Sequence, residues 1–221
     1  MKKILLLLCL VFVLTGCSVK TISNDNIDTI IDSVLKEENS LSNSYFSGYK
    51  YYLPRGIKMV NKKEYNAKLV SGNKTYYLFV DVIAYYNKAS MTFTANNESY
   101  YSRKLYYNGK EGYIEITKEK DNYFIELMYN YAKIETLVKQ KDLNSTILRS
   151  LSILSSIKYN DIIIETLIGE NVLDYKETMF NIFGPHRDTD EFLKYEEDYQ
   201  YQGGQGNNKD DSEILQTESN G

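Results

Sequence analysis

A hairpin signal in the middle of the chain constrains its fold more than any other feature. Asn108-Gly109 separates two runs, 103–107 and 112–117, that mix apolar and polar residues. An Asn-Gly pair between such runs is the strongest short-range signal for a two-residue hairpin, because both residues tolerate the positive φ angles of a type I′ turn. The surrounding sequence is therefore expected to form an antiparallel sheet.

Further strand segments flank this hairpin. Residues 67–70 and 75–86 enclose the turn sequence SGNK, and the second run (TYYLFVDVIAYY) is so apolar that it predicts a central strand covered on both faces. Shorter runs at 48–53 and 57–60 come before it, and residues 123–134 follow the hairpin. Residues 87–102 predict a long loop or an irregular edge. Together the runs predict six or seven strands in a largely antiparallel meander.

Apolar residues at helical spacing frame the strands. Residues 27–35 carry five aliphatic side chains three and four positions apart, after a capping pair at 24–25, and predict an N-terminal helix. The acidic polar face of this helix favours packing on the sheet over lying on an anionic membrane. A closing helix is predicted behind Asp142 as its cap, which makes the fold class α+β. Its apolar stripe is Leu143, Ile147, Leu148, Leu151, Leu154 and Ile157.

The N-terminus has the pattern of an exported chain. Lys2 and Lys3 precede an apolar run at 4–14, shorter than the roughly 20 residues that cross a membrane but typical of a secretory signal. The run ends in Leu14-Thr15-Gly16-Cys17, which resembles the lipobox of bacterial lipoproteins. The resemblance implies cleavage between Gly16 and Cys17, acylation of the Cys17 thiol, and attachment to the extracytoplasmic face of the cell membrane. A plain signal peptide with an incidental cysteine is the alternative.

Cysteine usage limits the chemistry of the mature chain. The sequence has two cysteines; Cys9 is expected to leave with the signal and Cys17 to carry lipid. No thiol would then remain for catalysis, a disulfide or a metal site, and we expect no cofactor and no metal. The expected organisation is a signal peptide at 1–16, a tether at 17–23, an α+β domain at 24–160, an acidic docking helix or arm at 161–201, and a disordered tail at 202–221.

The order of the elements is similar to that of the PsbP-like fold. A helix, a meander of strands and a final helix that ends in Ser155-Ser156-Ile157 carry this resemblance, which covers residues 45–159, about half of the chain. It rests on no diagnostic motif. It implies an exported assembly factor or binding module, and it transfers no site residues.

Charge is divided unevenly along the chain. Residues 45–160 contain 18 Lys and Arg against 10 Asp and Glu, whereas residues 161–221 contain 4 against 15. The basic part could face anionic phospholipid or a wall polymer, or the charges could serve solubility alone. We expect the membrane as one partner and an envelope protein or an anionic wall polymer as another. Nucleic acid is not expected, because no recognition motif is present.

Few residues suggest catalysis. His186, the single histidine, lies in the turn sequence GPHR and cannot form a multi-histidine metal site. The acidic stretches 188–191 and 196–198 lack the ligand spacing of an EF-hand and predict a solvated surface. Glu111, Glu115 and Glu119 could act as hydrolase carboxylates, but their alternation with apolar residues favours a wet sheet face.

Tyrosine is abundant, with 22 Tyr, 8 Phe and no Trp, and Tyr-Tyr pairs recur. Tyrosines on an open sheet face could stack on sugars or hold peptides. Alternatively, the joint excess of Tyr, Lys, Asn and Ile reflects a low-GC genome. The candidate ligand-binding residues are Tyr76, Tyr77, Tyr85, Tyr106 and Tyr107.

Three hypotheses follow for the function. The favoured one is a non-enzymatic binding or assembly lipoprotein of the cell envelope. The second is a carboxylate-dependent cell-wall or glycan hydrolase. The third is an interaction protein whose acidic C-terminal arm recruits a basic partner.

Overall fold

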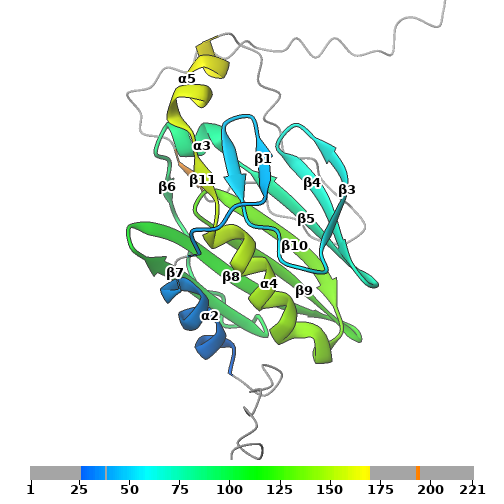
Figure 1. Ribbon diagram of the computed structural model, residues 1–221. Helices are drawn as coiled ribbons and strands as arrows, with labels where there is room; N and C mark the ends of the chain where they lie inside the picture. Colours follow the sequence, from blue (N-terminus) through cyan, green and yellow to red (C-terminus); the bar gives the residue numbers. More distant parts are fainter. Residues whose placement is uncertain (1–25, 38, 170–192, 195–221) are drawn as a thin grey trace, which may run out of the picture.

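A seven-stranded antiparallel sheet forms the body of the protein (Figure 1). The computed structural model describes residues 26–37, 39–169 and 193–194. The strand order is β3-β4-β5-β10-β9-β8-β7, and every neighbouring pair is antiparallel. This arrangement confirms the predicted α+β class with six or seven strands. The strands are β3 (Lys58–Lys63), β4 (Asn66–Ser71), β5 (Lys74–Val80), β7 (Tyr101–Tyr107), β8 (Lys110–Glu119), β9 (Asn122–Tyr129) and β10 (Ala132–Val138).

Two smaller sheets lie beside the main one. The first has the order β1-β2-β11, so the hairpin of β1 and β2 pairs with a strand more than 100 positions later in the sequence. The second pairs β6 with β12. The bounds of these strands are β1 (Ser44–Phe46), β2 (Tyr49–Tyr51), β6 (Ser90–Met91), β11 (Lys158–Tyr159) and β12 (Leu193–Lys194).

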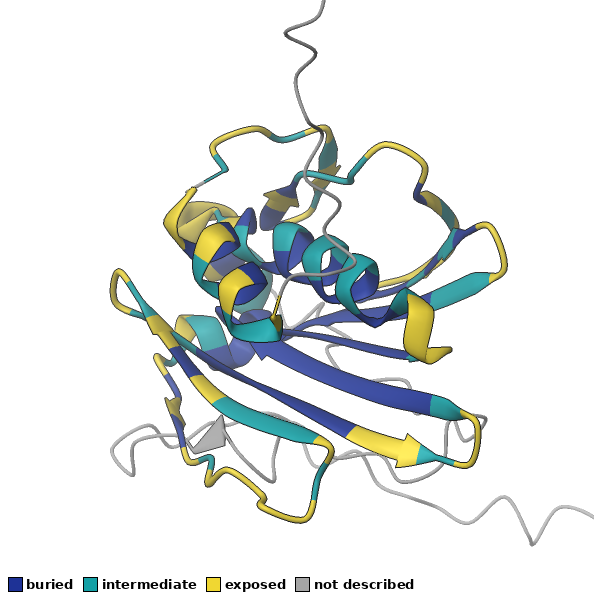
Figure 2. Ribbon diagram, turned by 90° about the horizontal axis from the view of Figure 1, so that it is seen from below, coloured by how far each residue is buried: buried dark blue, intermediate teal, exposed yellow. Residues whose placement is uncertain are grey.

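Two helices, α2 (Ile27–Lys36) and α4 (Leu143–Ser155), cover one face of the main sheet (Figure 2). The predicted stripe of α4 is confirmed, because Ile147, Leu151 and Leu154 are fully buried against β9 and β10. The N-terminal helix is confirmed as well, but it starts later than predicted. Its cap is Asn26, whose side chain accepts a hydrogen bond from the backbone N–H of Asp28 at 3.2 Å.

An arginine on β7 holds α2 in place. Arg103 Nη1 lies 2.9 Å from Asp28 Oδ1, and Arg103 Nη2 lies 2.7 Å from Asp32 Oδ1. The hydroxyl of Tyr101 donates to Asp28 Oδ1 at 2.6 Å. The acidic face of this helix, which the sequence showed as a row of carboxylates, is therefore partly neutralised by the edge of the sheet.

The long apolar run 75–86 is not one strand. The strand β5 ends at Val80, and the helix α3 (Val82–Tyr86) follows it. The break occurs at Asp81, whose carboxylate accepts a hydrogen bond from the N–H of Ala84 at 2.7 Å. Apolarity alone does not separate a buried strand from a buried helix, and the capping aspartate decides between them here.

Asp142 is the N-cap residue of α4, as predicted, but its side chain does not cap the helix. Asp142 precedes α4, after the short 3₁₀ helix Gln140–Asp142, but its side chain makes no capping hydrogen bond. Its carboxylate instead binds Lys74 Nζ at 2.9 Å, so the start of α4 is tied to the start of β5. Its partner Lys74 lies on β5, the neighbour of β10 in the sheet, so this contact could not be predicted from the local sequence.

Several expectations fall outside the described residues. They include the tether at 17–23, Cys17, His186, the acidic residues beyond 194 and the tail at 202–221. Within the described residues no helix is long and apolar enough to cross a membrane. The last helix with described bounds is α5 (Asp161–Gly169), which projects from one end of the domain (Figure 1).

Gly112 of β8 offers a test of how closely β8 packs against β9. A Cβ atom there would meet the backbone oxygen of Met128 and would lie 2.8 Å from Tyr129 Cα, both backbone atoms of β9. We expect Gly112→Ala to lower the free energy of unfolding by about 1–3 kcal/mol, because backbone cannot rotate away as a side chain does. Urea denaturation measures this. Gly169→Ala, where nothing lies within 4 Å of the new atom, is the control; equal stability of the two variants would contradict the packing.

Candidate functional site

A cavity lies between the three-stranded sheet β1-β2-β11 and the start of α5. Its volume is about 550 Å³. The walls come from two distant parts of the chain, the hairpin of β1 and β2 and the segment 158–163, which β11 brings side by side. We call it the aromatic pocket. Its lining residues are Tyr45, Phe46, Tyr49, Lys50, Lys158, Tyr159, Asn160, Asp161, Ile162 and Ile163.

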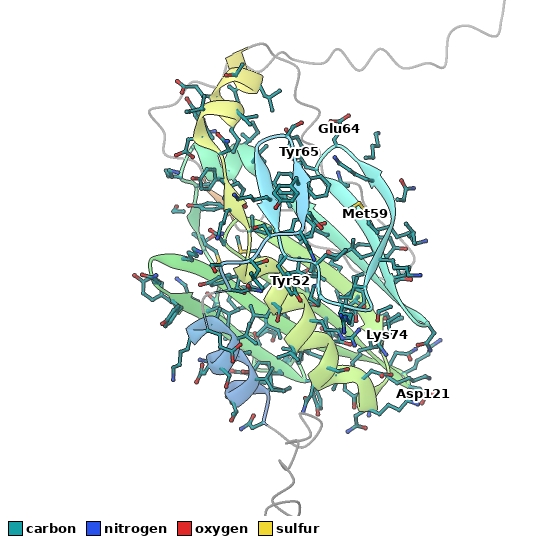
Figure 3. All side chains as sticks on the ribbon, viewed as in Figure 1. Tyr52, Met59, Glu64, Tyr65, Lys74 and Asp121 are labelled. Atoms are coloured by element: carbon teal, nitrogen blue, oxygen red, sulfur yellow. The ribbon has the colours of Figure 1, made fainter. Side chains whose placement is uncertain are left out.

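Stacked rings build the hairpin wall of the aromatic pocket. The ring of Phe46 stacks on Tyr49 at 4.9 Å and on Tyr51 at 5.3 Å. The ring of Tyr65, labelled in Figure 3, lies 5.9 Å from that of Tyr49. Alternation in the strands sends Tyr49 and Tyr51 to the same buried side. Tyr45 is 70% exposed and stands at the rim, where a ligand can reach it.

Gly48 positions the opposite wall. It has a φ of +88°, which suits the tight turn between β1 and β2, and a Cβ there would lie 2.7 Å from Ile164 Cγ1. Its carbonyl accepts a hydrogen bond from the N–H of Asn160 at 2.8 Å. The side chain of Asn160 then caps α5 by accepting from the N–H of Ile163 at 3.2 Å. The glycine therefore lets α5 start directly against the hairpin.

A second ring stack lies behind the pocket. The rings of Tyr85 and Tyr159 are 3.8 Å apart and nearly parallel. The hydroxyl of Tyr159 donates to the carbonyl of Asn130, and that of Tyr85 donates to Asp161 Oδ1, each at 2.7 Å. Burial raises the pKa of Tyr159 well above its usual value. These bonds fix both rings and engage the one carboxylate that lines the aromatic pocket.

Cations surround the aromatic pocket. Lys50 and Lys158 line it, and Lys158 Nζ also donates to the carbonyl of Ser40 at 2.6 Å. Lys62 Nζ lies 4.1 Å from the centre of the Phe46 ring, and Lys88 Nζ lies 3.8 Å from that of Tyr85. Burial raises the pKa of Tyr49 and Tyr51 far above neutrality, so these phenols stay uncharged. The positive charge of the lysines therefore dominates the pocket's surroundings.

The five tyrosines predicted to bind a ligand are not brought together. Tyr76 is fully buried under the helices, and Tyr77 points to the other face of the sheet. Tyr106 is 68% exposed on the edge strand β7, and Tyr107 lines a second cavity of about 270 Å³, which shares Lys158 with the aromatic pocket. Only Tyr85 stands beside the aromatic pocket. Ligand binding by these residues stays a prediction.

The sequence did not predict the pocket residues, because they come from segments more than 100 positions apart. The one local signal was the alternation of aromatic and polar residues at 49–51. Nothing in the sequence indicated that Lys158-Tyr159 would pair with that hairpin. The strand β11 is only two residues long, which is too short for a periodic pattern.

Three glutamates form a row across the sheet face away from α4. Glu115, Glu126 and Glu135 are direct neighbours in register on β8, β9 and β10, and all are buried. Like charges directly opposite one another repel, so each carboxylate needs a donor. Ser99 Oγ donates to Glu115 at 2.6 Å and Tyr113 OH donates to Glu126 at 2.7 Å. Glu135 Oε1 forms an ion pair with Lys133 Nζ at 3.2 Å.

The predicted wet sheet face is wrong for Glu115. The loop that follows β6 covers it, since Phe93 stacks on Tyr113 at 4.2 Å and Asn96 Nδ2 donates to Glu115 at 3.1 Å. The glutamate row does not line the cavities of about 550, 270 and 210 Å³ that described residues form. Hydrolysis by carboxylates stays a prediction. Among the described residues there is also no group of three or more His, Cys, Asp or Glu that could hold a metal ion.

The N-terminus matches a known class. Residues 1–18 match the prokaryotic membrane lipoprotein lipid attachment site, and this match supports a membrane-anchored bacterial lipoprotein. Cys17 lies within the matched residues; its acylation and the cleavage before it stay predictions. No curated protein matches the chain. The PsbP-like resemblance is not shown by these comparisons and also stays a prediction.

The bond between Tyr85 and Asp161 can be tested by alkaline titration. Burial, together with the hydrogen bond and the charge of Asp161, raises the pKa of Tyr85 to about 12. The raised pKa stabilises the fold below pH 10, and this contribution is lost as the pH rises towards 12. We expect Asp161→Asn to lower the pKa of Tyr85 without restoring its usual value, because burial remains.

Ultraviolet absorbance of the phenolate measures this shift, and Tyr85→Phe identifies which part of the titration belongs to Tyr85. Asp121→Asn, an exposed change far from the pocket, serves as the control. An Asp161→Asn protein that titrates like the unmodified chain would contradict the assigned hydrogen bond.

Proposed function

We propose that the protein is a non-enzymatic binding lipoprotein on the extracytoplasmic face of the cell membrane, and that the aromatic pocket holds its ligand. The observation that carries the proposal is a cavity of about 550 Å³ with aromatic walls and lysines around it. Ligand sites are typically cavities of roughly 300–1,000 Å³ with apolar walls and a few polar groups that orient the ligand. The pocket has this composition.

The ligand that fits best is a sugar unit of an anionic wall polymer. Exposed Tyr45 offers a ring face on which a sugar can stack, and Phe46 adds apolar contact from the wall of the pocket. Lys50 and Lys158 offer charge for a phosphate or carboxylate of the polymer. Asp161, the one acidic residue in the lining, is hydrogen-bonded to Tyr85 and so opposes an anion less than a free carboxylate would.

The basic character of the domain also supports an anionic ligand. Residues 45–160 hold 18 Lys and Arg against 10 Asp and Glu. Such a surface raises the local concentration of polyanions and speeds their association. Attachment to the membrane by a lipid keeps the pocket next to the wall without a second binding site.

Binding to cell walls tests the proposal. The acylated full-length mature chain, in detergent micelles, is mixed with purified walls that carry their anionic polymer and with walls from which it has been removed. We expect sedimentation with the first and little with the second. Tyr45→Ala should weaken binding about two- to tenfold through lost stacking, and Lys50→Glu should weaken it further through charge repulsion.

Two matched variants control for exposure and charge. Tyr106→Ala removes a ring that is 68% exposed, close to the 70% of Tyr45, but far from the aromatic pocket. Lys58→Glu reverses an exposed lysine on β3. Equal binding by Tyr45→Ala and Tyr106→Ala, or equal binding to both kinds of wall, would refute the proposal.

A further inference from the structure

Three segments meet at the end of the domain where the described chain begins. They are the start of α2, the turn between β8 and β9 at 119–122, and the connection from β10 to α4 at 139–142. Val138 and Lys118 both pair with Tyr123, so the last two segments are neighbours. Tyr101, which binds Asp28 at the start of α2, pairs with Ile116 just before the turn. Figure 1 shows these segments at the lower end of the domain.

This end carries exposed positive charge. Lys118, Lys120, Lys139 and Lys141 are all exposed. Within the part of the chain that the structure describes, no carboxylate forms an ion pair with any of them. We call them the basal lysines.

Several acidic residues at this end are already engaged within the domain. Asp142 pairs with Lys74, and Asp28 and Asp32 pair with Arg103. Glu119 and Asp121, which flank Lys120, remain as the acidic residues of the turn. Their two charges oppose the four of the basal lysines, and Asp28 and Asp32 leave one net negative charge beside the single Arg103, so the balance of this end stays positive.

The lipid attachment keeps this end close to a bilayer. Eight residues separate Cys17 from Asn26, the first described residue. Even when fully extended, a chain of this length reaches only about 30 Å. The start of α2 therefore stays within that distance of the headgroups. The anchor gives the domain a high effective concentration at the bilayer, so even weak contacts with headgroups contribute to binding.

We propose that the basal lysines dock the domain on anionic phospholipid headgroups. Each lysine near an anionic bilayer strengthens the contact by about fivefold, and the contact weakens within a Debye length of about 10 Å at 0.1 M salt. Docking turns the aromatic pocket away from the bilayer, because α4 runs from the basal end towards β11. This proposal rests on the lipid anchor and is independent of what the pocket binds.

Lysine footprinting tests the docking. The acylated full-length mature chain is reconstituted in vesicles of phosphatidylcholine alone or with phosphatidylglycerol, and its lysines are modified with an amine-reactive reagent and read by mass spectrometry. In the anionic vesicles we expect modification of the basal lysines to fall about fivefold and to recover in high salt. Lys62 and Lys88, exposed on β3 and after α3, should be modified equally in both vesicles.

Charge-neutralising substitutions at the turn give a second test and are not expected to disturb folding. Glu119→Gln with Asp121→Asn removes the opposing charges of the turn, so protection should persist to higher salt. Glu64→Gln, which changes an exposed acid at the other end of the domain (Figure 3), should leave protection unchanged. Equal modification of the basal lysines in the two vesicles would overturn the proposal. Equal protection of Lys62 and Lys88 in the anionic vesicles would overturn it as well.

Discussion

The packing of α4 across the main sheet is the constraint on which the rest of the structure depends. Its aliphatic face covers β9 and β10, and burial of each such side chain stabilises the fold by about 1.5–3 kcal/mol. The small Thr146 and Ser150 are fully buried between the larger residues, which allows a close approach to the sheet. The helix α2 packs on α4 in turn. The helix α4 therefore contacts both the main sheet and α2 and holds them together.

The same helix separates the two ends that matter for function. It starts immediately after the basal lysines and leads into β11, which builds the aromatic pocket. Its 13 residues span about 20 Å at about 1.5 Å per residue. A domain tied to the membrane beside the start of α4 therefore carries its pocket away from the lipid. In the two proposals, the basal lysines contact phospholipid headgroups, and the lysines around the aromatic pocket contact a wall polymer.

Much of the fold followed from local patterns, and much of the site did not. The Asn108-Gly109 hairpin and the stripe of α4 were predicted because turn chemistry and periodicity are local. The break at Asp81 was missed because one capping side chain overrides a long apolar run. The pocket and the ion pair between Lys74 and Asp142 were missed because they depend on contacts across the sequence. Sequence patterns carry no information on which distant segments become neighbours.

The most direct test of the account is the distance of each end from the bilayer. The chain has no cysteine besides Cys9 and Cys17, so Asp121→Cys and Glu64→Cys each add one site for a fluorophore, at the basal and at the opposite end. Energy transfer from the fluorophore to an acceptor dye on the lipid headgroups of anionic vesicles reports the distance. If the basal end lies on the bilayer, we expect much stronger transfer from position 121 than from position 64. Equal transfer, or stronger transfer from position 64, would contradict it.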